Sequence, residues 1–294
     1  MNFVKKLTIL MLTVFGCSNK PSIEELQKFA AVEEYPEDTY LDTVTNKKAM
    51  IIVAHDDDDC FMSGTISKLT KSGWEIQQVS FVTTQLKEGQ KEHPSTIICT
   101  GNTPVLEDGD YRIGLDTMQF PYKPIPKSQM EKEFKKDKII ESLRSKINTF
   151  KPSVIFTMDN EIGGYGHPEH VFISQTVLDI FSDSLIDVER IYQGVYTNHM
   201  EKEIIETWLY NRMKEYKFPN PYMLGKAVYN VSGMPEPNVQ INIAAQASDK
   251  IAYLMAYHND ARKNMRKFIP YFEEFDTKTY FSVFDREFFR VIER

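Results

Sequence analysis

The sequence is poor in several residue types on which common protein classes depend. Its 294 residues include only three cysteines, which is too few for a scaffold built on disulfides. Lysine and arginine number 35 against 42 aspartate and glutamate residues, so the net charge is −7. Non-specific binding to nucleic acid depends on basic surfaces. The acidic balance therefore argues against a nucleic-acid-binding protein.

The sequence does contain enough apolar residues for a large core. Hydrophobic residues make up 41% of the chain and aromatic residues 12%, a composition that excludes global disorder. A chain of this length can form one large α/β domain or two small ones. No internal repeat and no low-complexity tract is visible in the sequence.

The N-terminus has the pattern of a secretory signal peptide. Lys5-Lys6 precedes the short apolar run 7–15, which ends at Gly16-Cys17. This run cannot span a bilayer, because that needs roughly 20 apolar residues. Residues 12–17 resemble a bacterial lipobox, which implies cleavage before Cys17 and attachment of lipid to its sulfur. The alternative is an ordinary signal peptide with an incidental cysteine.

These patterns divide the chain into three parts. We expect a lipoprotein signal peptide at 1–16, a polar tether at 17–45 and a single domain at 46–294. Only Cys60 and Cys99 then remain in the domain. Two cysteines do not establish a disulfide framework, so we expect two unpaired, partly buried thiols.

Strand patterns and helix patterns alternate along the expected domain. Apolar and β-branched runs predict strands, and amphipathic runs with capping signals predict helices. The expected strands are 49–54, 75–82, 153–158, 189–198 and 239–243, and the expected helices are 61–72, 128–150, 168–181, 201–216 and 244–268. This alternation favours an α/β, Rossmann-like three-layer sandwich around a mostly parallel sheet. We expect loops at 219–237 and 85–127, the second of them as a lid or a substrate loop.

A cluster of acidic residues follows the first expected strand. The apolar run 49–54 leads directly into His55 and four aspartates, residues 56–59. Ligands of open α/β sheets bind outside the carboxyl ends of the strands, and adjacent carboxylates repel one another unless a cation or raised pKa values relieve them. The cluster therefore indicates a metal site, with a solvated acidic turn as the alternative. An EF-hand calcium loop is excluded, because Phe61 and Ser67 occupy the positions of its glycine and glutamate.

A second motif follows the expected strand 153–158. Three glycines at 163, 164 and 166 form a tight loop, and Pro168 is suited to the first position of a helix. His167 and His170 are three residues apart, so they can face the same side at the start of this helix. Carboxyl ends of parallel strands meet at one edge of a sheet, so we expect this pair to converge with the residues that follow the first strand.

The two motifs together resemble those of a known enzyme family. Ala54-His55-x-Asp57-Asp58-Asp59 resembles the Ala-His-Pro-Asp-Asp-Glu signature of the LmbE-like (PIG-L) zinc N-deacetylases, and Gly166-His167-Pro168-Glu169-His170 resembles their Gly-His-Pro-Asp-His signature. The preceding Gly163-Gly164-Tyr165 is most similar to the branch that acts in the mycothiol pathway. The family usually has an Arg-x-x-Glu helix that helps to hold the sugar, and no counterpart is visible between residues 84 and 127.

The resemblance implies a metal centre. Its ligands would be His55, Asp58 and His170, with a water molecule in the open position of a catalytic zinc site. The same donors suit Fe²⁺, so the cofactor is inferred to be Zn²⁺ with Fe²⁺ possible. Asp59 and Glu169 would orient the ligands through hydrogen bonds.

The resemblance also implies catalytic roles. Asp57 would be the general base and would then pass its proton to the leaving amine. A protonated His167 would stabilise the negative charge that develops on the amide oxygen. Tyr165 would donate a hydrogen bond to the same oxygen or to the amine, or else would simply pack on its loop.

From the resemblance and the lipobox we expect a zinc-dependent hydrolase, anchored by lipid in a bacterial cell envelope, that removes an N-acetyl group from an N-acetylglucosamine-type sugar or glycoconjugate. One alternative is an amidase that acts on another N-acyl group or on a non-sugar amide. The other is a lipoprotein that binds sugar without catalysis. The residues that the chemistry requires are all present, which favours an enzyme.

Overall fold

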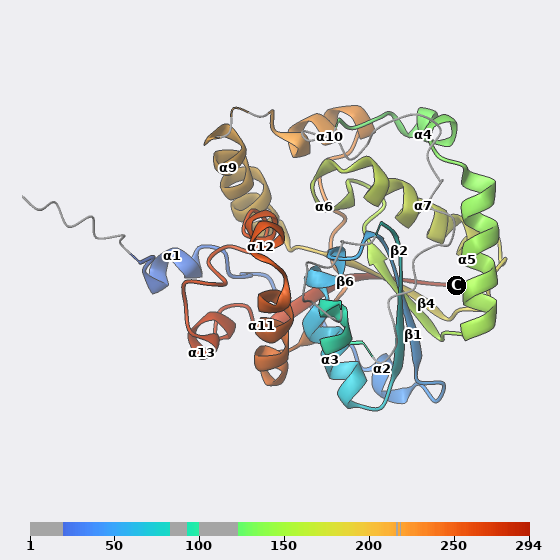
Figure 1. Cartoon of the computed structure of the whole chain (residues 1–294), viewed down its shortest axis with the longest axis horizontal. Coiled ribbons are helices and arrows are strands. Elements are labelled where there is room, and N and C mark those ends of the chain that lie inside the picture. Colours follow the sequence, from blue (N-terminus) through green and yellow to red (C-terminus); the bar gives the residue numbers. More distant parts are fainter. Residues whose placement is uncertain (1–19, 83–92, 100–122, 216, 218) are drawn as a thin grey trace, which may run out of the picture.

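A six-stranded mixed sheet forms the centre of the computed structural model, which describes residues 20–82, 93–99, 123–215, 217 and 219–294 (Figure 1). Its strands are β1 (Lys48–His55), β2 (Glu75–Val82), β3 (Val154–Met158), β4 (Arg190–Val195), β5 (Val239–Asn242) and β6 (Arg286–Glu293). They lie in the order β2-β1-β3-β4-β6-β5. The first four are parallel, whereas β6 runs antiparallel to both of its neighbours. The prediction of an α/β fold with a mostly parallel sheet is confirmed.

Helices cover both faces of this sheet. On one face α3 (Ser63–Lys71) and α11 (Ala247–Ala256) pack against Ile51 and Val53 of β1. On the other face α5 (Lys136–Phe150) and α7 (Pro168–Ser182) pack against Met50 and Ile52. Alternate residues of a strand point to opposite faces, so a strand between two helical layers is apolar throughout. This explains the unbroken apolar run of β1 (Figure 1).

The other helical segments are short. They are α1 (Ile23–Gln27), α2 (Tyr40–Thr43), α4 (Lys127–Glu133), α6 (Gly163–Gly166), α8 (Asn198–Met200), α9 (Tyr210–Glu215), α10 (Pro221–Tyr229), α12 (Asn259–Met265), α13 (Thr277–Phe281), the 3₁₀ segments η1 (Asp58–Phe61), η2 (Pro94–Ile97) and η4 (Ala244–Gln246), and the π-helix η3 (Glu201–Leu209). Two expected long helices are interrupted: 128–150 becomes α4 and α5, and 244–268 becomes η4, α11 and α12.

The prediction of a loop over residues 219–237 is wrong, because α10 lies within it. Asn220 caps this helix: its side-chain oxygen accepts hydrogen bonds from the backbone N–H groups of Tyr222 and Met223, at 3.0 Å and 3.4 Å. Pro221 occupies the first helical position, where a missing N–H costs nothing. A proline-rich stretch can therefore start a helix as well as prevent one.

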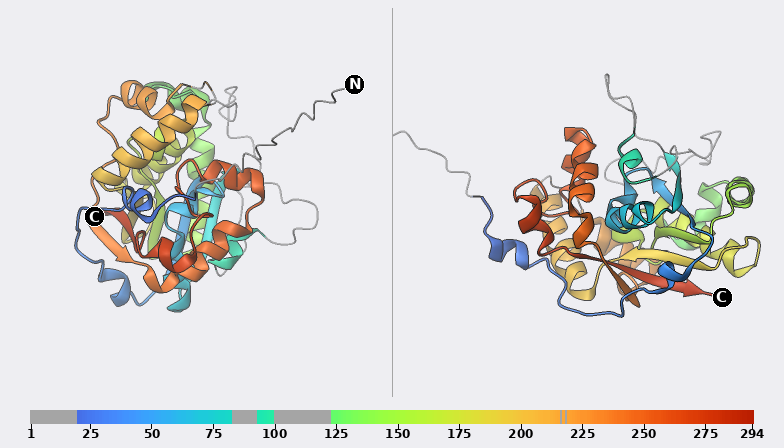
Figure 2. Two further views of the ribbon diagram at one scale, coloured as in Figure 1. Left: turned by 90° about the vertical axis from the view of Figure 1, so that its left-hand side faces the viewer. Right: turned by 90° about the horizontal axis from the view of Figure 1, so that it is seen from below.

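Residues 20–45 differ from the expected tether. They follow the outside of the domain (dark blue in Figure 2) and contact it at several points. Phe29 packs against Trp208 with ring centroids 5.5 Å apart. Tyr192 donates a hydrogen bond of 2.8 Å to Asp38, and Glu37 forms an isolated β-bridge with Gln240. From residue 20 onward, this segment is thus folded against the domain.

The predicted lipid-attachment residue Cys17 and the signal peptide 1–16 lie outside the described residues, as does most of the expected loop 85–127. Cys60 and Cys99 are buried and unpaired, which confirms the prediction of two free thiols. None of the helices in the described ranges has both the length and the apolar character needed to cross a bilayer.

Candidate metal centre and active site

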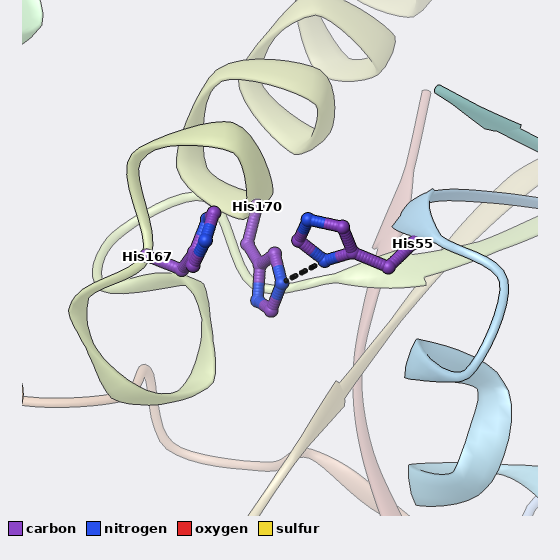
Figure 3. Close-up of side chains that lie close together, drawn as sticks. All are labelled: His55, His167 and His170. Carbon is purple, nitrogen blue, oxygen red and sulfur yellow. Dashed lines mark hydrogen bonds between the residues drawn. The ribbon is translucent and has the colours of Figure 1, made fainter. Parts of the chain in front are cut away.

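The two sequence motifs meet at the carboxyl-terminal edge of the sheet. His55 is the last residue of β1, and Asp58 begins η1 directly after it. His167 caps α7, and His170 lies in its first turn. Figure 3 shows the rings of His55, His167 and His170 close together, with centroids 4.6 Å to 5.0 Å from one another. The expected convergence of residues 115 positions apart is therefore present in the structure.

Asp159 holds the loop that carries the second motif. It follows β3, and its carboxylate accepts hydrogen bonds from the backbone N–H groups of residues 161–164, at 2.6 Å to 3.1 Å. Burial raises the pKa of Asp159, and these N–H donors oppose the rise. Gly163 and Gly164 both have positive φ. The sequence analysis assigned no role to Asp159, although a carboxylate directly before a glycine-rich loop was a usable signal.

Hydrogen bonds within the protein determine which ring nitrogen of each candidate ligand carries the proton. The Nε2 atom of His55 lies 2.8 Å from a carboxylate oxygen of Glu169, and the Nδ1 atom of His170 lies 2.9 Å from the carbonyl oxygen of Gly163. Both partners are acceptors, so these two nitrogens carry the protons. His55 Nδ1 and His170 Nε2 are left with free lone pairs. Glu169 thus contacts His55 directly, and its role in orienting that ligand stays a prediction.

These two lone-pair nitrogens face each other beside a carboxylate. They are 3.0 Å apart, and the carboxylate oxygens of Asp58 lie 3.5 Å from His55 Nδ1 and 3.2 Å from His170 Nε2. Atoms that bind one zinc ion tetrahedrally are roughly 3.4 Å from one another. Two acceptor nitrogens at this separation need a proton or a cation between them. The three predicted ligands fit a single divalent cation.

A second group of potential ligands overlaps the first. Nitrogen atoms of His55, His167 and His170 all lie within 4.8 Å of one another, as do donor atoms of His55, Asp57 and Asp58. The Nδ1 atom of His167, however, accepts a hydrogen bond from the backbone of Glu169 at 3.3 Å. Its ring stacks on that of His170 with centroids 4.6 Å apart. This places His167 beside the site, and in a neutral ring its proton lies on Nε2.

Asp57 and Asp58 have different environments although they are adjacent. Burial, together with the charge of Asp58, raises the pKa of Asp57 to about 6. Burial acts in the same direction on Asp58, but His170 and His55 outweigh it and hold the pKa of Asp58 well below its usual value. No described residue donates a hydrogen bond to the Asp57 carboxylate. Asp57 is thus suited to accept a proton near neutral pH.

Asp59 does not occupy the position that was predicted for it. Its carboxylate is fully buried and accepts a hydrogen bond from the hydroxyl of Tyr253 on α11. Burial raises its pKa well above the usual value, with the Tyr253 hydrogen bond acting against the rise. In the described part of the chain, no hydrogen bond or ion pair joins this carboxylate to His55 or His170, so Asp59 supports the packing of α11 behind η1.

The other aspartate of the cluster, Asp56, lies 2.8 Å from the Nε2 atom of His93. Its backbone carbonyl accepts hydrogen bonds from Gln78 and Tyr257. The sequence analysis took His93 for a surface or structural residue. Nothing in the spacing of positions 56 and 93 marks them as partners, because tertiary folding alone brings η2 to this loop.

Tyr165 is packed and also lies next to the ligands. Its ring stacks on Phe268 at 4.2 Å and meets the ring of His170 edge-on at 5.2 Å. Gly164 and Gly166 flank it, both with positive φ. The two alternatives from the sequence are therefore compatible, since a packed ring can still present its hydroxyl to the site.

The region that contains both motifs is similar to a known protein family. Residues 50–181 match the model of the PIG-L family, described as GlcNAc-PI de-N-acetylase. No curated protein matches the sequence. One similar solved structure is N,N'-diacetylchitobiose deacetylase from Pyrococcus horikoshii, with 16% identity over 84% of each chain and a TM-score of 0.41.

Two further solved structures are comparably distant. A zinc-inhibited form of teicoplanin deacetylase has 10% identity over 84% of this chain and 98% of its own, with a TM-score of 0.43. The 4-carboxy-2-hydroxymuconate hydratase of Pseudomonas putida has 10% identity over 84% of this chain and 97% of its own, also at 0.43. The family match includes both motifs of the candidate site, so residues 50–181 carry the PIG-L (LmbE-like) match.

Proposed function

We propose that this chain is a zinc-dependent hydrolase that removes the N-acetyl group from an N-acetylglucosamine-type sugar or glycoconjugate. The observation that carries the proposal is the pair of lone-pair nitrogens on His55 and His170, 3.0 Å apart and both beside Asp58. The PIG-L match over residues 50–181, whose family description is a de-N-acetylase, supports the same reaction.

Different residues of the site carry out different steps of amide hydrolysis. Bound at His55, Asp58 and His170, a zinc ion would polarise the amide carbonyl and lower the pKa of a water molecule to about 7. Asp57 takes the proton of the attacking water, for which its pKa of about 6 is suited. When the carbon–nitrogen bond breaks, the same carboxyl passes that proton to the leaving amine.

His167 and Tyr165 stabilise the carbonyl oxygen as it gains negative charge. Because the Nδ1 atom of His167 accepts the N–H of Glu169, the proton of a neutral ring lies on Nε2, which can then donate to this oxygen. This differs in detail from the protonated His167 that the resemblance implies. Removing one such donor typically costs 100-fold to 1,000-fold in turnover, that is, about 3 to 4 kcal/mol.

Zinc is proposed over Fe²⁺, although two imidazoles and a carboxylate suit either ion. We also propose that the protein is exported and held on the bacterial envelope through lipid on Cys17, which the motif at residues 12–17 supports. Exported enzymes meet envelope or environmental glycans, so such a glycan is the proposed substrate. The similarity of Gly163-Gly164-Tyr165 to the mycothiol branch remains a prediction.

Acetate release tests the proposal. The full chain is incubated with a panel of N-acetylated glycans, before and after treatment with a chelator and after adding back Zn²⁺ or Fe²⁺. We expect acetate from at least one glycan, loss of release with the chelator and recovery with Zn²⁺. Release that persists without any metal would contradict the proposal, and a protein that only binds sugar would release no acetate.

A further inference from the structure

Asp56 lies within the first motif but outside the candidate metal site. It is 1% exposed, and among the described residues neither group of potential metal ligands includes it. The family signature has a proline at this position, between the histidine and the first aspartate. A buried carboxylate is costly unless the protein pairs it with a charge or hydrogen-bonds it. The groups around Asp56 therefore determine how this carboxylate can be buried.

His93, which caps η2, provides one partner for the carboxylate. Its Nε2 atom lies 2.8 Å from a carboxylate oxygen of Asp56. The ring N–H is not aligned with this oxygen, so the contact is electrostatic rather than a linear hydrogen bond. On the other side of the ring, Nδ1 accepts the backbone N–H of Ser95 at 3.2 Å, so the proton of a neutral ring lies on Nε2. The positive side of the ring therefore faces Asp56.

The backbone of Asp56 is held as well. Its carbonyl oxygen accepts hydrogen bonds of 3.0 Å from the side chain of Gln78 and of 3.2 Å from the hydroxyl of Tyr257. Gln78 lies in β2, and Tyr257 directly follows α11. The ring of Tyr257 also meets that of His93 edge-on, with centroids 5.8 Å apart. Three segments that are distant in the sequence thus fix one residue of the turn after β1.

The neighbours of Asp56 are the residues that the proposed chemistry needs. His55 precedes it, and Asp57 and Asp58 follow it. The backbone N–H of His55 donates a hydrogen bond of 2.9 Å to the carboxylate of Asp58, which closes the turn. One peptide bond joins Asp56 to His55 and another joins it to Asp57, so a fixed Asp56 restricts the movement of both.

A proline at position 56 would restrict the same turn by different means. Its ring fixes φ near −65°, and it favours an extended conformation in the residue before it. His55 meets this requirement, because it is the last residue of β1. A proline would thus stiffen the turn by its covalent geometry, whereas this chain has a side chain that is held from η2.

We propose that His93 is a positioning residue: through Asp56, it holds residues 55–58 in the arrangement that binds the metal ion. The proposal rests on the proposed function, and it adds to that site a residue from outside both motifs. In the described part of the chain, no hydrogen bond or ion pair joins His93 to any of the three candidate ligands. Its effect on the metal ion is therefore transmitted by Asp56.

Zinc affinity tests the proposal, measured on the full chain by competition with a chromophoric chelator. His93→Asn keeps a side-chain acceptor for the N–H of Ser95, so η2 stays capped, but it has no atom in the place of Nε2. Loss of a group that orients metal ligands typically weakens metal binding about 10-fold to 100-fold. We expect a loss in this range for His93→Asn.

Double variants show whether Asp56 is the link. Asp56→Ala should weaken zinc binding about as much as His93→Asn. The two changes combined should weaken it no further, because both remove the same contact. Asp56→Pro combined with His93→Asn should bind zinc as tightly as the wild type, since proline stiffens the turn without the ion pair. The two double variants are matched, because both lack the buried charge at position 56.

His258→Asn is the control for the loss of a capping histidine. The Nδ1 atom of His258 accepts a backbone N–H at the start of α12, as that of His93 does at η2. The His258→Asn variant should bind zinc like the wild type. A loss as large as that of His93→Asn would overturn the proposal, because it would show that helix capping and not Asp56 is responsible.

The remaining outcomes are also distinguishable. Wild-type affinity in His93→Asn, losses that add in the double variant with Asp56→Ala, or equal affinity of the two double variants would overturn the proposal and leave the metal site in place. If circular dichroism shows that the proline variant does not fold, additivity of the other two changes decides. A wild-type chain that binds no zinc would overturn the proposed function, and this proposal with it.

Discussion

Each histidine of the candidate ligand set has one ring nitrogen bonded to a protein acceptor. The acceptor is Glu169 for His55, and it is the carbonyl of Gly163 for His170. Such contacts fix the tautomer and point the other nitrogen at the ion. Hydrogen bonds within the protein therefore orient these two lone pairs toward each other, as a shared metal ion would require.

At this scale the sequence predicted residues that lie within a motif and missed those that only folding brings together. The family resemblance implied His55, Asp58 and His170 as ligands, and each of them lies next to an element end whose direction was predictable. The partners His93 and Tyr253 come from η2 and α11, so their approach to Asp56 and Asp59 depends on packing between distant segments.

Replacement of the proposed base should separate catalysis from metal binding. Asp57→Asn removes the proton acceptor and leaves His55, Asp58 and His170 in place, so metal content should stay at the wild-type value. Turnover should fall about 100-fold to 10,000-fold, the usual contribution of a general base. Acetate release and bound metal are measured on the same sample, with the exposed Asp187→Asn as a control. Wild-type turnover in Asp57→Asn would remove this residue from the mechanism.

At the scale of elements, α10 buttresses the loop of the second motif. A side chain at Gly166 would meet the carbonyl oxygen of Pro221 in α10, with its β-carbon only 2.4 Å away. Tyr229, at the other end of α10, donates a hydrogen bond of 3.0 Å to the carbonyl of Gly166. The glycine in the motif is thus required by a helix that the sequence analysis assigned to a loop.

Two glycine substitutions distinguish this close approach from backbone strain. Gly166 and Gly73 both have positive φ, but a β-carbon on Gly73 meets nothing within 4 Å. Gly73→Ala should cost about 1 kcal/mol of unfolding free energy from strain alone. Gly166→Ala should cost clearly more, about 3 kcal/mol, because it also displaces α10. Urea unfolding measures the free energy of unfolding of both variants. Equal decreases in the two variants would show that α10 can move away from Gly166 without cost.

At the scale of the whole molecule, the layered architecture was predictable and the attachment of the N-terminal segment was not. Strand periodicity and helix alternation follow from local sequence, which is why the buried parallel strands were found nearly at their bounds. Residues 20–45 are polar and contain two prolines, a composition that resembles a linker. They are ordered by a few specific contacts, and such contacts are invisible to composition.

Phe29 tests how strongly that segment is held. It is buried against Trp208 and Tyr271, with ring centroids 5.5 Å and 6.0 Å away. Phe29→Ala should lower the free energy of unfolding by about 3 kcal/mol. Val32 is 68% exposed on the same segment, so Val32→Ala should change it by less than about 0.5 kcal/mol. A Phe29→Ala variant as stable as the wild type would mean that the segment contributes nothing to the fold.

The stoichiometry of bound metal tests the central claim most directly. The full chain and its His170→Ala variant are equilibrated with Zn²⁺, dialysed and analysed for metal by mass spectrometry, with circular dichroism to confirm folding. We predict one tightly bound ion per wild-type chain and less than about a tenth of an ion in the variant, since losing one of three ligands removes most of the affinity. A full equivalent of zinc in folded His170→Ala, or none in the wild type, would contradict the account.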